Sequence, residues 1–450
     1  MTRQADDSTR FRRISGGRLT RRQLVARGLA TGAALPALSL TGGLRPGLVA
    51  AQGALAGEVE FWRLSGAGFQ GEVFNDAGKR LHEANPGVTV KVQELQNDPF
   101  KTKLAVAMGS DSPPDVWHTW GGGVLAEYVN AGAVLDITDE LAKNDWGQRF
   151  APAVLNLMKV KDRSYGVPIN ASGVFFWYNK DLFAKHEITP PATWDELLAV
   201  VGKLKGAGLT PIALGNKTKW PGAFYLNYLV ERIAGEDYLA QVLAGQASFT
   251  DPSFIEVGKR LQELVNAGAF QNGFNGVDWD TGGSRQLLYA GKAAMELMGN
   301  WLPPIVAGES KGFETKLDFF PVPPLPGGKG DPSSIVGGAG YGYAVSQKSK
   351  AAAASVELLR FLTDDTVRDA FAQNGEVPAM QGAKITDPRT QKVADALAKA
   401  KHLQLYWDQF LPPELGQAQL DVTQGLLSLD LTPEEAAKKM DEVAKKAASA

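Results

Sequence analysis

Hydrophobic and polar positions follow two different periods along the first part of the chain. Residues 58–64 and 88–95 alternate with the period of a half-buried strand, whereas residues 72–85 and 100–108 carry apolar side chains at helical spacing. A short third strand is predicted at 115–117. Strands that alternate with helices in this rhythm predict a parallel α/β sheet.

The same rhythm returns in a second unit. Thr193 and Glu196 form a capping box that predicts a helix start, and a short strand is predicted at 211–214. Further helices are predicted from 220 and from 251. From residue 352 the chain has helical spacing to its end, and we expect this part to pack on the second unit.

Between the two units lies GVPINASGVFFWYNKDLF, residues 166–183. Pro168 fixes its own φ and restricts Val167 to extended conformations. A small polar patch, 170–173, then precedes a strand-like apolar run, 174–178. Two strand-like pieces joined in this way predict either a crossing between two lobes or one bent strand in a single sheet.

Composition adds limits to this picture. The 450 residues suffice for two or three domains, and 44% apolar with 21% charged residues is typical of a globular protein. The absence of cysteine excludes disulfides, thiolate metal sites and a lipidated N-terminal cysteine. The four histidines are far apart in the sequence, so we expect no metal and no cofactor.

Charge is divided unevenly along the chain. Residues 1–45 carry a net charge of +7, so the remaining residues carry −9. An acidic body argues against nucleic acid as a partner, because phosphate binding needs a positive face.

The basic N-terminus has the order of an export signal. Arg21 and Arg22 precede a modestly apolar run, 29–40, and small-residue cleavage sites follow at 49–51 and 54–56. We interpret residues 1–56 as a twin-arginine-type signal peptide, with a disordered basic tail as the alternative. The apolar run is too short for a membrane span. We therefore expect an exported protein that is soluble after cleavage.

Aromatic residues recur beside small polar residues at predicted loop positions. They are Trp120, Trp220, Trp279, Trp301, Tyr341 and Trp407. Sugars present flat apolar faces and hydroxyl groups, so a sugar site needs aromatic planes together with amides or carboxylates. Each of these residues could instead belong to the core.

The first of these aromatics follows the predicted strand at 115–117. Ligands in α/β sheets bind beyond the carboxyl ends of strands, and Gly121 and its neighbours would let the backbone approach a ligand closely. The Lys-Ser/Thr ending of a phosphate loop is missing. The alternative for Trp120 and Gly121 is a plain tight turn.

Asp278 and Asp280 flank Trp279 in a predicted loop. Two such carboxylates could serve glycoside hydrolysis, but a loop does not hold them on one face. We interpret them as solvated or sugar-bonding residues. The chain has no G-x-S-x-G elbow and no Walker sequence.

Residues 58–450 resemble the extracellular solute-binding proteins of sugar ABC importers, of the maltodextrin-binding type. The stretches that carry the resemblance are Pro114-Asp115-Val116, 174–183, Thr193 to Leu197 and Gly291 to Met295. Trp120 to Gly123, followed by Ala131-Gly132, is closer to xylobiose- and raffinose-type binders.

This resemblance implies a two-lobed periplasmic-binding-protein fold of type II. Each lobe would be a mostly parallel sheet flanked by helices. The N-terminal lobe would comprise 57–169 and 301–350, and the C-terminal lobe 170–300 and 351–450. Hinge crossings would fall at about 169–172, 298–301 and 349–356.

The resemblance also implies a site. Trp301 and Trp407 would stack on the sugar, so we expect alanine at either position to weaken sugar binding, and Asn170 and Ser172 would lie at the cleft floor. The predicted ligand-binding residues are Trp120, Gly121, Asn170, Trp220, Asp278, Trp301, Tyr341, Trp407 and Asp408.

The function implied is binding without catalysis. A monomer without a lipid anchor, in the periplasm or at the extracellular face of the membrane, would close on an oligosaccharide and deliver it to ABC permease subunits. The alternatives are an extracytoplasmic glycoside hydrolase and a binding protein for a non-sugar solute.

Overall fold

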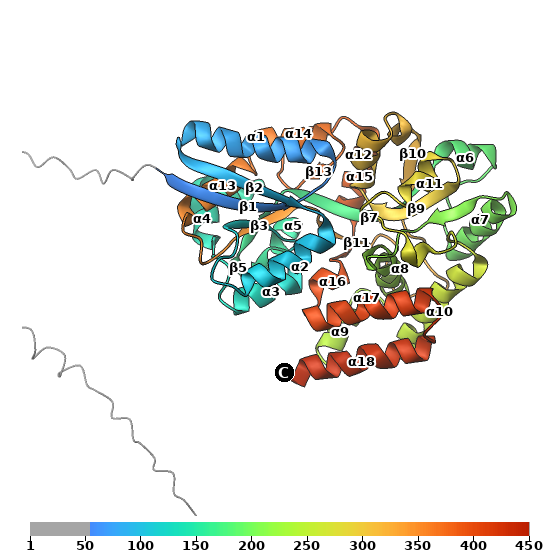
Figure 1. The fold of residues 1–450 in the computed structure, drawn as a ribbon. Coiled ribbons are helices and arrows are strands. Elements are labelled where there is room, and N and C mark those ends of the chain that lie inside the picture. The colour runs from blue at the N-terminus through green and yellow to red at the C-terminus, as the bar shows by residue number, and fades with distance from the viewer. Residues whose placement is uncertain (1–54, 450) are drawn as a thin grey trace, which may run out of the picture. The chain divides into compact units, whose positions relative to one another are not determined.

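The computed structural model describes residues 55–449 (Figure 1). The predicted signal peptide lies outside these residues, except for its last two. None of the helices between residues 55 and 449 has the length and apolar surface that a bilayer span requires.

The first sheet has the strand order β2-β1-β3-β12-β6. Its strands are β1 (Ala56–Leu64), β2 (Gly87–Leu95), β3 (Val116–His118), β6 (Gly166–Pro168) and β12 (Gly342–Val345). β1 pairs in parallel with both β2 and β3, which confirms the parallel arrangement predicted for these three strands. β12 joins them from the far end of the sequence and pairs antiparallel with β3 and β6.

The second sheet is built around β7 (Asn170–Asn179), all ten residues of which are buried. Its order is β14-β11-β7-β9-β8, with strands β8 (Thr210–Ala213), β9 (Ala293–Gly299), β11 (Ile335–Ala339) and β14 (Leu403–Gln404). β10 (Leu317–Phe320) and β13 (Val377–Pro378) also pair with β7. Every partner of β7 is antiparallel, so this sheet is mixed rather than mostly parallel.

Helices cover both sheets, and we call each sheet with its helices a lobe. The first lobe holds α1 (Gly68–Ala84), α2 (Asn97–Met108), α3 (Gly122–Asn130), α4 (Thr138–Ala142), α5 (Pro152–Asn156), α13 (Ala352–Phe361) and α14 (Asp365–Gln373). α13 and α14 contact α1, although they come from the C-terminal part of the chain (Figure 1).

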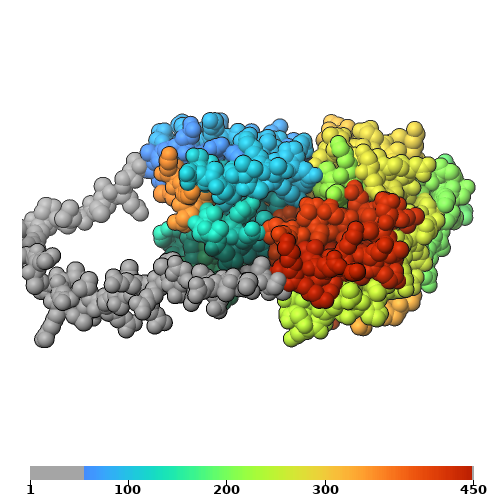
Figure 2. Space-filling model, turned by 60° about the horizontal axis from the view of Figure 1, so that its bottom comes forward, coloured from blue at the N-terminus to red at the C-terminus, as the bar shows by residue number. Residues whose placement is uncertain are grey.

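The second lobe contains the remaining α-helices. They are α6 (Lys180–Lys185), α7 (Trp194–Gly206), α8 (Trp220–Ile233), α9 (Tyr238–Leu243), α10 (Pro252–Ala267), α11 (Arg285–Tyr289), α12 (Leu302–Glu309), α15 (Pro388–Lys399), α16 (Trp407–Phe410), α17 (Pro413–Leu427) and α18 (Pro433–Ser449). α17 and α18 pack on α10, as expected for the C-terminal helices, whereas α13 and α14 do not belong here. Figure 2 shows the C-terminal segment in red against the teal part of the first lobe, where α16 contacts α3.

Between residues 55 and 449, the chain crosses between the two sheets at three places. Ile169 alone separates β6 from β7, so the stretch 166–183 is a lobe crossing and not one bent strand. The second crossing, 340–341, joins β11 to β12, and the third, 374–376, joins α14 to β13.

The crossings predicted at 298–301 and 349–356 are wrong. Gly299 pairs with Val174 inside the second sheet, and β10, which comes after it, pairs with β7 again. Residues 349–351 precede α13 and residues 352–356 belong to it, and α13 contacts β12 within the first lobe.

Candidate functional site

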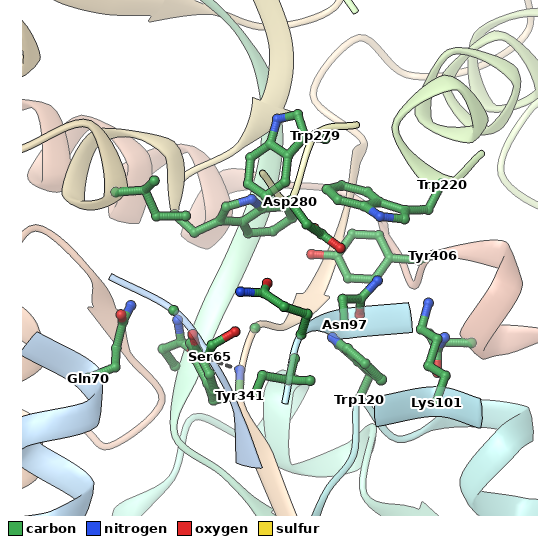
Figure 3. Close-up of a pocket in the computed structure, with 18 of the residues that line it drawn as sticks. Ser65, Gln70, Asn97, Lys101, Trp120, Trp220, Trp279, Asp280, Tyr341 and Tyr406 are labelled. Atoms are coloured by element: carbon green, nitrogen blue, oxygen red, sulfur yellow. Dashed lines mark hydrogen bonds between the residues drawn. The ribbon is translucent and has the colours of Figure 1, made fainter. Parts of the chain in front are cut away.

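A cavity of about 260 Å³ lies between the two lobes (Figure 3). From the first lobe it is lined by Leu64 to Gly66 after β1, by Gln96 and Asn97 after β2, and by Trp120 after β3. These are the carboxyl ends of parallel strands, where α/β sheets bind ligands. Trp120 lines the cavity from the end of β3, and the ends of two neighbouring strands line it as well.

Seven aromatic side chains line the cavity: Trp120, Trp220, Phe224, Trp279, Trp301, Tyr341 and Tyr406. On the second lobe their rings form a connected wall. The ring centroids of Trp220 and Trp279 lie 5.0 Å apart, and the ring of Trp301 lies 6.3 Å from Phe224 and 6.2 Å from Tyr406. Figure 3 shows Trp220, Trp279 and Tyr406 across the cavity from Trp120.

One indole of this wall has an unused donor. Trp220 is buried, and its Nε1 has no hydrogen-bond partner in the described part of the chain. An indole nitrogen can only donate, and a buried donor without an acceptor is costly.

An ion pair joins the lobes at the cavity. Lys101 Nζ of α2 lies 2.8 Å from Asp408 Oδ2 of α16, and the same carboxylate oxygen accepts a hydrogen bond from Gln409 Nε2 at 2.8 Å. Lys101 Nζ also lies 5.1 Å from the ring centroid of Trp120. Lys101 thus contacts the ring of Trp120 in its own lobe and the carboxylate of Asp408 in the other lobe.

Asp280 is the cavity carboxylate that pairs with no cation among residues 55–449. Burial, with the nearby carboxylates of Asp98 and Asp278, raises the pKa of Asp280 to about 6. Arg285 is occupied elsewhere, because it pairs with Glu309 at 2.6 Å and lies 4.4 Å over the ring of Trp279. Asp280 can therefore accept hydrogen bonds from ligand hydroxyls.

Six of the nine predicted ligand-binding residues line the cavity: Trp120, Asn170, Trp220, Trp301, Tyr341 and Asp408. Trp279, singled out among the loop aromatics, lines it as well. Gly121, Asp278 and Trp407 do not, and neither does Ser172, which is fully buried beneath the crossing.

The three exceptions have structural reasons. Asp278 faces Lys217 at 3.2 Å and accepts a hydrogen bond from the backbone N–H of Asp280, so it shapes the turn. Trp407 is completely buried, and the adjacent Tyr406 takes the cavity position. Gly121 is the N-cap of α3 and has a positive φ.

Replacing Gly121 with alanine is expected to destabilise the protein by about 1–3 kcal/mol. Gly121 has φ +82°, and an added Cβ would lie 2.1 Å from the carbonyl oxygen of Leu157. Gly132→Ala is the matched control, because Gly132 has φ +70° with no atom within 4 Å of the added Cβ. Urea unfolding measures the free energy of unfolding of both variants. Equal losses of stability in the two variants would contradict a close contact between the added Cβ and Leu157.

Sequence reasoning missed Gln70, Asn97, Lys101, Arg285 and Tyr406. The rule that indicated Trp120 also applies to the end of the strand 88–95, and it would have indicated Asn97 and the helix start carrying Lys101. No comparable sequence signal identifies Arg285 or Gln70, because their neighbours in space are far away in the chain.

Known proteins resemble this chain over most of the described residues. The family model for bacterial extracellular solute-binding proteins matches residues 64–369. An uncharacterised ABC transporter extracellular-binding protein of Pyrococcus horikoshii is 29% identical over 278 residues, which are 60% of this chain and 61% of that protein. The chain thus matches about three fifths of that relative's length.

Two solved structures superpose on the chain with a TM-score of 0.80. One comes from work on xylan utilisation by Caldanaerobius polysaccharolyticus, is 29% identical, and covers 86% of this chain and 99% of its own. The other is a chitin oligosaccharide binding protein that is 26% identical and covers 88% of this chain and 100% of its own. This likeness confirms the predicted two-lobed fold.

Proposed function

Since the chain belongs to the bacterial extracellular solute-binding protein family, we propose that it binds an oligosaccharide outside the cytoplasm and delivers it to the permease subunits of an ABC importer. Members of this family are binding proteins and not enzymes. The proposal therefore includes no bond-breaking step, and the glycoside hydrolase considered from the sequence is set aside.

One observation carries the choice of a sugar. The cavity combines seven aromatic side chains with amides and carboxylates from both lobes, among them Asn97, Asn170 and Asp280. Aromatic planes stack on the apolar faces of sugar rings, and amides and carboxylates bind hydroxyls. The similar structures from xylan utilisation and of a chitin oligosaccharide binding protein support an oligosaccharide over a single sugar.

The lobes would move to enclose this ligand. Because ligand atoms would touch both lobes, binding would stabilise a closed arrangement, with bending at Ile169, 340–341 and 374–376. The strand pairings support a first lobe of 57–168 and 342–373 and a second of 170–339 and 377–449. Compared with the sequence-based boundaries, 301–339 moves to the second lobe and 351–373 to the first.

Export is the remaining part of the proposal. The twin arginines at 21–22 and the small-residue sites before residue 57 support a cleaved signal of the twin-arginine type. A monomer without a lipid anchor would then work at the outer side of the membrane.

Calorimetric titration of the mature protein against xylo-, chito-, malto- and raffinose-type oligosaccharides tests the proposal. We expect one class to bind and to be recovered chemically unchanged. Binding of no sugar would overturn the proposal, and so would release of shorter sugars that is lost in Asp280→Asn. Asp278→Asn is the matched control, because Asp278 does not line the cavity.

A further inference from the structure

Glu376 lies at the third crossing, between α14 of the first lobe and β13 of the second sheet. Its side chain is completely buried, and it does not line the cavity. A carboxyl group in such a position needs hydrogen-bond partners, because burial without them is costly.

Three side-chain amides surround this carboxyl group. Gln70 Nε2 of α1 donates to Oε1 at 3.3 Å, Asn170 Nδ2 donates to Oε2 at 3.0 Å, and Asn300 Nδ2 donates to Oε2 at 3.3 Å. Gln70 belongs to the first lobe, Asn170 begins the crossing strand, and Asn300 follows β9 of the second lobe. Gln70 and Asn170 also line the cavity.

Two of these amides have a fixed orientation. Asn170 Oδ1 accepts the backbone N–H of Tyr341 at 2.7 Å, and Asn300 Oδ1 accepts the backbone N–H of Gly173 at 2.9 Å. Their NH₂ groups must therefore point to Glu376 Oε2.

The third amide is free to turn over. Gln70 Oε1 is buried and has no partner among residues 55–449. With this amide rotated, its carbonyl oxygen accepts a proton carried on Glu376 Oε1, and its NH₂ group takes the buried position that Oε1 occupies without a partner. In this rotated arrangement Glu376 is neutral with its proton on Oε1, while Asn170 and Asn300 still donate to Oε2.

The charges around Glu376 agree with this assignment. No Lys, Arg or His of the described chain forms an ion pair with it. The ionisable groups that sense its charge are the phenols of Tyr341 and Tyr406, and burial raises the pKa of both, so they stay neutral. Burial raises the pKa of Glu376 itself to about 8.

We propose that Glu376 is a positioning residue of the sugar site, whose neutral carboxyl group holds Gln70 of one lobe and Asn170 of the crossing in their ligand-binding orientations, so that its ionisation weakens binding. This inference rests on the proposed function. Ionisation would remove the proton that Gln70 accepts and leave a buried charge beneath the cavity.

Glu376→Gln and Glu376→Leu separate this role from a merely structural one. Between pH 7 and pH 9 the neutral fraction of a group with a pKa near 8 falls about tenfold, and we expect the affinity of the natural protein for its oligosaccharide to fall by about the same factor. Glu376→Gln, which keeps the shape and cannot ionise, should bind equally well at both pH values. Glu376→Leu, which removes the partners of the amides, should bind about tenfold more weakly at every pH.

Stability gives a second readout that needs no ligand. In the unfolded chain the carboxyl group of Glu376 ionises near its ordinary pKa, whereas in the folded protein it ionises near pH 8. At pH values between these two, the folded state therefore binds more protons than the unfolded state. The urea midpoint of the natural protein, relative to Glu376→Gln, should therefore fall from pH 5 to pH 8 and then level off.

The outcomes distinguish the two proposals. Sugar binding with the same pH profile in the natural protein and Glu376→Gln would overturn the inference and leave the proposed function standing. If no sugar binds at any pH, the proposed function fails, and the unfolding profiles still decide the state of Glu376. If the urea midpoints of the natural protein and of Glu376→Gln changed equally with pH, the carboxyl group of Glu376 would not be neutral, and the inference would be wrong.

Discussion

Replacing Trp407 with alanine is expected to lower the free energy of unfolding by about 3–5 kcal/mol, the usual cost of removing a large aromatic side chain from a core. Trp407 is completely buried, with its ring centroid 6.1 Å from that of Phe249. Its backbone N–H donates to Asn227 Oδ1 at 3.2 Å, which ties the start of α16 to α8. Because its side chain does not line the cavity, the variant that remains folded should bind sugar with little change.

Urea unfolding followed by circular dichroism measures the loss, and titration at low temperature measures the affinity of the folded protein. Trp301→Ala is the matched control, because it makes the same substitution at a partly exposed cavity position. If Trp407→Ala had normal stability and clearly reduced affinity for sugar, the prediction would be wrong. Trp407 would then stack on the sugar, as the family resemblance implies.

Local patterns predicted the elements of the fold well. The continuous apolar run 174–178 became part of the fully buried β7, as expected for a strand covered on both faces. Thr193 is the N-cap as predicted, because its Oγ1 accepts the backbone N–H of Glu196 at 3.2 Å, while Glu196 Oε2 accepts the backbone N–H of Ala192 at 2.7 Å. Signals of this kind depend on residues close together in the sequence, and so they can be found there.

The crossings depend on pairing between distant segments, and the sequence predicted only one of three. Gly299-Asn300-Trp301 resembles the polar break at 170–173, yet it forms a strand-to-helix turn. What keeps the chain in the second lobe is the pairing of Phe320 with Phe176, far away in the sequence. No local pattern reports such a pairing.

At two places the sequence-based prediction missed the residue that lines the cavity by only one or two positions. Tyr406 and Trp407 are neighbouring aromatics, and the packing of α16 against α17 decides which of them faces the cavity. Asp278 and Asp280 are similarly ambiguous until Lys217 holds the first and leaves the second at the cavity. Side-chain direction in short helices and turns is a tertiary property.

Replacing Trp301 with alanine is expected to weaken oligosaccharide binding by about 1–3 kcal/mol, or about 5- to 150-fold. Its ring lies in the aromatic wall between Phe224 and Tyr406 and is partly exposed in the cavity. An exposed ring face is available for stacking on a sugar, and alanine removes it. Calorimetric titration with the sugar class that binds the natural protein measures the change.

Trp301→Phe and Gly299→Ala test whether the ring acts by its position. A Cβ on Gly299 would lie 2.0 Å from Cζ3 of Trp301, so alanine there displaces the indole without removing it. We expect Gly299→Ala to approach the affinity loss of Trp301→Ala, and Trp301→Phe, which keeps a ring in place, to lose less than either. Normal affinity in both alanine variants would mean that the sugar does not stack on Trp301, and the wall formed by Trp220 and Trp279 would then be the stacking surface.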